Sequence, residues 1–200
     1  MRLEHPYYIV DRGLSHEVCQ RIIEAGESAE AMAAQAIRDP QNTVRNSTVS
    51  WLGSETGTAW LFNALGTIVR EANERLWHWT LSGPESMQYT RYGPEQYYTW
   101  HADQRRRPYP PDDQRWPGLT RKLSAVVSLS DGKNYQGGDF QLEILDSPPD
   151  QPERRLKTLA EIRNMGSVLV FPSFLYHQVR PVTAGERRSL VAWFLGPPFV

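Results

Sequence analysis

The stretch Gly166-Ser-Val-Leu-Val-Phe-Pro-Ser-Phe-Leu-Tyr-His177-Gln-Val carries the strongest structural signal in this chain of 200 residues. An apolar run typical of a buried strand leads to a turn at Pro172-Ser173, and a second strand follows that carries His177. A polar segment then separates this strand from Arg187-Arg-Ser189 and the apolar run Leu190–Leu195. The pattern predicts a β-hairpin, and strands built this way belong to a mainly β protein.

The register of this hairpin predicts which side chains share a face. Pro181 cannot donate to a strand ladder, which favours a loop that begins near it and pairs Arg187 close to Val179. Arg187 and Ser189 then face the same side as His177. Since a guanidinium binds a carboxylate through two parallel hydrogen bonds and stays charged, we predict a carboxylate site beside His177.

Upstream, His101-Ala102-Asp103 supplies two further ligand-type side chains. Residues two apart on a strand project from the same face, so both can lean toward one point, and His177 can close the site. Two imidazoles and one carboxylate on one side of an ion form the facial set of non-haem iron(II) oxygenases. Zinc more often takes closed sets with cysteines, and the single cysteine, Cys19, lies elsewhere. The alternative is a core histidine and a turn acid.

From about Tyr89 to Trp193 the chain resembles the 2-oxoglutarate and iron(II)-dependent dioxygenases, in particular the prolyl 4-hydroxylase-like branch with its PKHD-type hydroxylases. The resemblance rests on four segments: Arg91-Tyr92-Gly-Pro-Glu-Gln-Tyr-Tyr98-Thr-Trp-His101-Ala-Asp103, Arg121-Lys-Leu-Ser-Ala-Val-Val-Ser-Leu, Tyr135-Gln-Gly-Gly-Asp-Phe, and Phe171-Pro-Ser through His177 to Arg187. One departure is that many prolyl 4-hydroxylases place a lysine where this chain has Arg187, which bears on the substrate more than on the cosubstrate.

The resemblance implies a role for each matched residue. His101, Asp103 and His177 would bind iron(II), and Arg187 would hold the distal carboxylate of 2-oxoglutarate. The remaining candidates for the cosubstrate pocket are Tyr92, Tyr98 and Ser189. The alternative for the two tyrosines is ordinary packing on a strand, and for Ser189 it is a hydrogen bond to a strand neighbour.

Composition and length bound the fold. With 40% hydrophobic residues, the chain suits one domain over 1–200, with helical support at about 14–80 and a jelly-roll core at about 87–197. Apolar residues at helical spacing follow Ser15, with a pattern that fades through the alanine-rich stretch to Ile37, and a second helix is expected from about Thr58 to Trp79. We therefore predict an α+β, mainly β fold, a double-stranded β-helix with N-terminal helices packed on one sheet.

Charge and cysteine content restrict the partners. Lys+Arg 22 against Asp+Glu 23 gives a net charge of −1, which argues against nucleic acid or an anionic membrane as partner. One cysteine excludes an internal disulfide, and no apolar amino-terminal run resembles a signal peptide. We expect a cytoplasmic setting, which also helps to keep iron ferrous. The oligomeric state is not determined by these observations.

The proline-rich segment 104–120 follows the His-x-Asp ligands directly. Long loops of this kind are often functional lids. We predict that it folds over the substrate and that Arg107, Tyr109 or Trp116 contacts it; the alternative is a mobile surface loop.

The activity that the resemblance implies is hydroxylation of an unactivated C–H bond with iron(II), 2-oxoglutarate and O₂, and possible use of ascorbate. A prolyl residue of a peptide or protein is the preferred substrate. The alternatives are a free amino acid or small metabolite, a nucleic-acid demethylase, and a non-catalytic jelly-roll binding protein.

Overall fold

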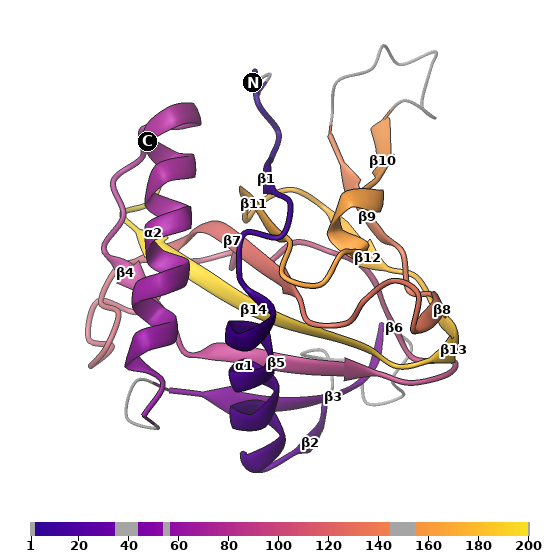
Figure 1. Cartoon of the computed structure of the whole chain (residues 1–200). Coiled ribbons are helices and arrows are strands. Elements are labelled where there is room, and N and C mark those ends of the chain that lie inside the picture. The colour runs from indigo at the N-terminus through magenta and orange to yellow at the C-terminus, as the bar shows by residue number, and fades with distance from the viewer. Residues whose placement is uncertain (1–2, 35–43, 54–56, 145–154, 200) are drawn as a thin grey trace.

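The computed structural model describes residues 3–34, 44–53, 57–144 and 155–199 (Figure 1). Two α-helices occur in these ranges, α1 (His16–Ser28) and α2 (Ala59–Leu76), together with a short 3₁₀ helix at Ala160–Arg163. The strands are β1 (Tyr8–Val10), β2 (Met32–Ala34), β3 (Arg45–Leu52), β4 (Gly83–Pro84), β5 (Met87–Tyr92), β6 (Tyr97–His101), β7 (Thr120–Ser128), β8 (Tyr135–Gly137), β9 (Phe140–Glu143), β10 (Leu156–Thr158), β11 (Val168–Pro172), β12 (His177–Val179), β13 (Val182–Gly185) and β14 (Arg187–Gly196).

Antiparallel pairing joins most strands into one curled sheet. Its order is β1-β11-β7-β14-β5-β3-β6-β12-β9-β10, so β3 pairs with β5 on one side and with β6 on the other. The strands before β6 in this order form the larger half, and β6-β12-β9-β10 form the smaller half. This arrangement confirms the predicted mainly β, jelly-roll class.

Local signals explain where the first helix begins. The hydroxyl of Ser15 accepts a hydrogen bond from the backbone N–H of Val18 at 3.3 Å, which caps α1. Cys19 and Ile22 are fully buried on its inner face, so Cys19 is a core residue. The alanine-rich continuation is not helical where it is described, because Met32–Ala34 forms β2 against β3. Ile37 lies outside the described residues.

The second helix ends earlier than its apolar pattern predicts. It stops at Leu76, and His78 takes a positive φ of 53°, which a continuing helix does not allow. The side chain of Asn73 fixes the exit, since it donates to the carbonyl of Trp79 at 2.8 Å and accepts from its N–H at 3.0 Å. No helix in the described ranges has both the length and the apolarity needed to cross a bilayer.

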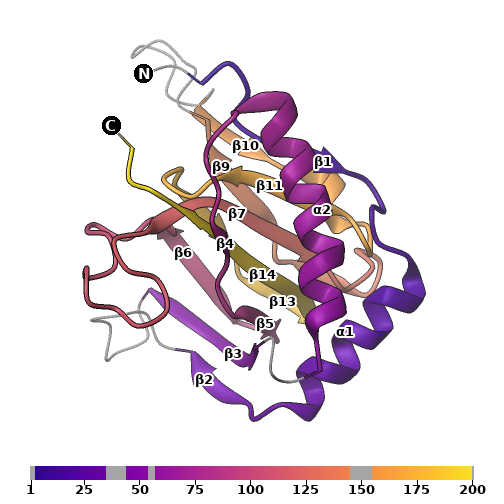
Figure 2. The ribbon, with the colours of Figure 1, turned by 90° about the vertical axis from the view of Figure 1, so that its left-hand side faces the viewer.

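Both helices cover the same face of the larger half-sheet, as Figure 2 shows. On β14, Leu190, Ala192 and Phe194 belong to the hydrophobic cluster that includes α1 and α2. Val191 instead packs on a second cluster, between the two halves. Because side chains alternate along a strand, odd-numbered residues from Arg187 to Trp193 face the interior of the jelly roll. The interior face holds the candidate site.

The predicted hairpin between the strands of His177 and Arg187 is wrong. His177 pairs with His101 on β6 and with Leu142 on β9, so both edges of β12 are already occupied. Arg187 pairs with Tyr92 on β5, and β7 takes the other edge of β14. Residues 182–185 form β13, which pairs with β8 instead. His177 and Arg187 therefore belong to opposite halves of the jelly roll.

Candidate metal centre and cosubstrate pocket

His101, Asp103 and His177 converge on one point at the open end of the smaller half. His101 ends β6 and His177 begins β12, and their Cα atoms are register partners. Asp103 lies just beyond the end of β6 rather than on the strand. Its carboxylate oxygens lie 3.8 Å from Nε2 of His101 and 3.5 Å from Nε2 of His177. The three candidate ligand atoms all lie within 4.8 Å of one another, which suits a shared metal ion.

Backbone carbonyls orient both imidazoles. Nδ1 of His101 lies 2.8 Å from the carbonyl of Thr99, and Nδ1 of His177 lies 3.1 Å from that of Leu175. A carbonyl only accepts, so each ring donates from Nδ1 and its Nε2 faces Asp103. This is the arrangement that fixes metal-ligating histidines in proteins.

The electrostatics favour the ligand forms of these groups. Burial, with a smaller contribution from His177, lowers the pKa of His101 to about 3, so its imidazole is neutral at physiological pH. Burial alone would raise the pKa of Asp103, but the two imidazoles, Arg121 and a hydrogen bond from Ser124 together lower it. A neutral imidazole and an ionised carboxylate are the species that bind a divalent cation.

Neighbouring side chains hold Asp103 in place. The Ser124 hydroxyl donates to Oδ2 at 2.7 Å, and Ser124 is itself 2.9 Å from the hydroxyl of Ser173. Arg121 donates to the Asp103 carbonyl at 3.3 Å and binds both oxygens of Glu85, at 2.8 and 2.7 Å. The aspartate is therefore positioned from β7 as well as from its own segment.

Arg187 is a buried cation that has no acidic partner among the described residues. Its side chain is 2% exposed, and Nη1 donates to the hydroxyl of Ser189 at 3.2 Å. The ring of Tyr92 lies beside it, with the centroid 5.6 Å from the guanidinium carbon. Among the described residues no carboxylate forms an ion pair with Arg187. The structure thus brings together Arg187, Ser189 and Tyr92 as predicted, although through β5 rather than through a hairpin.

Tyr98 stacks on a metal-ligand candidate and brings in a residue that sequence reasoning missed. Its ring lies parallel to that of His101, with centroids 3.4 Å apart and an interplanar angle of 10°. The guanidinium of Arg45 lies over the Tyr98 ring, 4.5 Å from the centroid. Burial raises the pKa of Tyr98 to about 12, so the phenol remains a hydrogen-bond donor. Arg45 gave no signal because an arginine at the start of a strand usually marks an exposed position.

Of the three residues in segment 104–120 that were predicted to contact the substrate, two line a cavity. Tyr109 and Trp116 line a space of about 570 Å³ together with Trp51 and Glu85. The backbone of Tyr109 bonds to Leu119, and the Asp113 carboxylate accepts from the N–H of Trp116, which gives the segment local order. Arg107 is exposed and is not among the residues that line this cavity. Glu85 connects the cavity to Arg121 and hence to Asp103.

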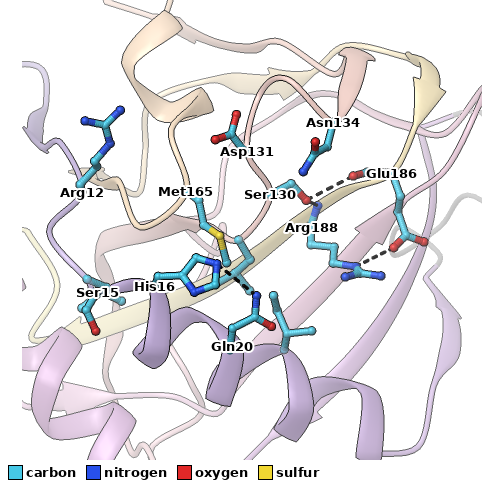
Figure 3. A pocket seen from close by; sticks show the side chains of 13 residues that line it. Arg12, Ser15, His16, Gln20, Ser130, Asp131, Asn134, Met165, Glu186 and Arg188 are labelled. Atoms are coloured by element: carbon cyan, nitrogen blue, oxygen red, sulfur yellow. Dashed lines mark hydrogen bonds and ion pairs between the residues drawn. The ribbon is translucent and has the colours of Figure 1, made fainter.

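A larger cavity of about 790 Å³ lies on the helix side of the sheet and contains none of the three metal-ligand candidates (Figure 3). Its polar groups pair with one another: Arg188 contacts Glu186 at 2.7 Å, Ser130 donates to the Glu186 carbonyl, and Gln20 contacts His16. The charges of Arg188 and Glu186 are thereby paired, and the cavity holds none of the three metal-ligand candidates, so we place the candidate site in the interior of the jelly roll.

The fold and the interior site together define a jelly-roll protein whose two histidines and one carboxylate form a candidate metal centre. The sequence model of the 2OG-Fe(II) oxygenase superfamily matches residues 87–195, and the chain belongs to that superfamily.

Curated relatives are PKHD-type hydroxylases. That of Pseudoalteromonas atlantica is 28% identical over 143 residues, which cover 70% of this chain and 57% of the relative. That of Shewanella baltica is 35% identical over 106 residues, covering 52% of this chain and 40% of the relative. The chain thus matches little more than half, or less, of the length of these proteins.

Solved structures share the fold. A Pseudomonas putida prolyl-4-hydroxylase superimposes with a TM-score of 0.68 at 22% identity and covers 96% of this chain and 92% of its own. A prolyl hydroxylase from Trichoplax adhaerens, in complex with a hypoxia inducible factor peptide fragment, gives a TM-score of 0.71 at 17% identity and covers 96% of this chain and 84% of its own.

Proposed function

We propose that this protein is an iron(II)- and 2-oxoglutarate-dependent hydroxylase. Two features of the jelly-roll interior carry the proposal. His101, Asp103 and His177 converge on one point, and Arg187 is buried with no ion-pair partner among the described residues. The overall reaction is R–H + 2-oxoglutarate + O₂ → R–OH + succinate + CO₂, in which one oxygen atom enters the substrate and the other enters succinate.

The side chains divide this work. Iron(II) bound by the three ligand residues would supply the activation of dioxygen. Arg187 would hold the distal carboxylate of 2-oxoglutarate through its planar guanidinium, and Ser189 keeps that guanidinium in place. Tyr98 packs along His101 and excludes water from one side of the ligand ring. The carbonyls of Thr99 and Leu175 keep the imidazole lone pairs directed inward.

We further propose a prolyl residue of a peptide as the substrate. Support comes from relatives named PKHD-type hydroxylases and from the cavity lined by Trp51, Tyr109 and Trp116, since aromatic-lined grooves suit proline-rich chains. A free amino acid is the second candidate, because Arg45 offers a further buried cation. We also propose a reducing, cytoplasmic setting, with ascorbate as an optional reductant, in keeping with the buried free thiol of Cys19.

Conversion of 2-oxoglutarate to succinate tests the reaction class without knowledge of the substrate. Protein loaded with Fe(II) should produce succinate slowly in air, whereas protein loaded with Zn(II) should not. Absence of succinate with bound Fe(II) would favour a non-catalytic binding protein. Mass spectrometry on peptides, amino acids and oligonucleotides should then show the gain of one oxygen atom, and a gain only on oligonucleotides would contradict the prolyl assignment.

A further inference from the structure

Arg45 is the second buried cation of the jelly-roll interior. It is 7% exposed, and alternation along β3 places it on the face opposite to Leu52, which packs under the helices. Nε donates to the hydroxyl of Ser47 at 2.9 Å, and Nη1 donates to Oε1 of Gln88 at 3.3 Å. Neither partner is charged, so the two bonds fix the guanidinium without neutralising it.

The remaining nitrogen of this guanidinium has no partner. Nη2 of Arg45 and Nε1 of Trp193 are the two buried side-chain nitrogens that lack a hydrogen bond in the described part of the chain. Trp193 lies on β14 with Arg187 and Ser189. Its ring contacts that of Trp51 on β3, with the two ring centroids 6.0 Å apart. A buried donor left unpaired costs roughly 1–3 kcal/mol, and more when it is charged. Both free donors therefore favour an acceptor that enters the interior from outside.

The position of Arg45 places that acceptor next to the metal centre. The guanidinium covers Tyr98, and Tyr98 covers His101. Since the imidazole occupies one face of the phenol ring, the guanidinium takes the other. Gln88, which holds Arg45, also donates to Thr90 at 2.8 Å, and Thr90 is the register partner of Ser189. A chain of polar contacts thus connects the surroundings of Arg45 with those of Arg187.

The charges of the described interior leave one place for an anion. Arg121 and Glu85 neutralise each other in a bidentate pair. Iron(II) and doubly ionised 2-oxoglutarate, which the proposed function requires, also cancel. Asp103 balances one of the two free guanidiniums, so one positive charge is left. An uncompensated charge in a buried site is expensive, and Arg45 is the guanidinium that the cosubstrate does not use.

We propose that Arg45 binds the primary substrate and that it takes a carboxylate which the substrate carries near the carbon that is oxidised. This inference rests on the proposed function and adds the substrate's charge to it. Two sources share this chemistry: the α-carboxylate of a free or chain-terminal residue, and an acidic side chain next to the reacting residue. An uncharged prolyl residue inside a neutral peptide would leave the charge of Arg45 without a counter-charge. Because Nη2 is enclosed, the carboxylate reaches it together with a side-chain movement.

Equilibrium binding to protein saturated with Zn(II) and 2-oxoglutarate tests the inference without turnover. Four probes separate the sources of the carboxylate: acetyl-Gly-Pro as the free acid, the same peptide as its amide, free L-proline, and acetyl-Asp-Pro-amide. At least one acid should bind roughly tenfold or more tightly than the neutral amide, and Arg45→Gln should remove this preference. Arg45→Lys should retain part of it, since the charge stays and the planar fork is lost.

Arg91→Gln is the matched control. Arg91 lies on the neighbouring strand β5 at a position that faces away from the interior, so the control removes the same charge from the other face of the sheet. It should leave the preference for the acid unchanged. Four results overturn the inference: no preference in the wild type, no binding of any acid, equal loss of acid and amide binding in Arg45→Gln, or loss of 2-oxoglutarate binding alone. Succinate formation by the wild type decides the proposed function separately.

Discussion

Arg187 and Arg188 are neighbours on β14, but their side chains lie on opposite faces of the sheet and differ in whether an acidic residue pairs with them. Arg188 points to the helix side, where Glu186 and Glu27 lie 2.7 and 3.3 Å from its guanidinium. Arg187 points inward, is 2% exposed and bonds to a serine. On the outer face the charge of Arg188 is paired within the chain, whereas on the interior face Arg187 has no ion-pair partner among the described residues. The comparison indicates that alternate residues of one strand serve different ends: those facing the interior form the candidate site, and those facing the helices stabilise the fold.

The largest expected effect separates the interior histidine from an exposed one. His177→Ala should abolish metal-dependent succinate formation, because it removes one of three ligand atoms. His16→Ala, on the exposed side of α1, should leave it unchanged. Bound iron measured after gel filtration checks the cause, and a variant that retains wild-type iron content would exclude His177 from the centre.

Replacing each of the two arginines by alanine in turn tests the difference between the interior and outer faces of β14. Arg187→Ala should weaken 2-oxoglutarate binding by about 2–5 kcal/mol, as expected when one partner of a buried ion pair is deleted. Arg188→Ala removes two partly exposed ion pairs and should change stability by about 1 kcal/mol or less, with no change in that affinity. Titration of 2-oxoglutarate into the Zn(II)-loaded variants measures both. Equal affinities in the two variants would remove Arg187 from the pocket.

The next pair of residues should separate stability from binding. Leu190 is fully buried under the helices, so Leu190→Ala should lower the free energy of unfolding by about 2–5 kcal/mol. Ser189→Ala should cost less stability and should instead weaken 2-oxoglutarate binding, since it frees the guanidinium of Arg187. Urea unfolding and ligand titration on both variants provide the check. A binding defect in Leu190→Ala that exceeds that of Ser189→Ala would contradict the division between faces.

The smallest expected effect is on the reactivity of Cys19, which lies on α1 at the helix side of the sheet. Burial raises the pKa of Cys19 to about 11, so its thiol stays protonated at pH 8. Its reaction with a disulfide reagent should be slow in the folded protein and fast in urea. As pH rises above about 8.5, the thiol ionises first in the unfolded state, so this group lowers stability toward pH 11. Rapid labelling of the folded protein would show that α1 opens readily.

Much of this organisation could be predicted from particular residues. The apolar run with its turn in 166–179 and the helical stripe after Ser15 reflect local propensities, which act between residues close in sequence. The convergence of the three candidate ligands was predictable because His101 and Asp103 lie two residues apart, and His177 is preceded by an apolar run and a turn. The end of α2 was not predictable from its stripe, because a side-chain bridge from Asn73 and the backbone of His78 set it.

The sequence by itself determined the strands around His177 and Arg187, the start of α1, the candidate ligand set and the alternation that points Arg187 and Ser189 the same way, because each depends on spacing along the chain. Only the tertiary structure decided which strands pair. It placed β12 between β6 and β9 and β14 between β5 and β7, so that His177 and Arg187 belong to opposite halves of the jelly roll instead of to one hairpin. The tertiary structure alone also decided that Arg45 is buried against Tyr98, since pairing between distant strands depends on which edges and faces the rest of the fold leaves free.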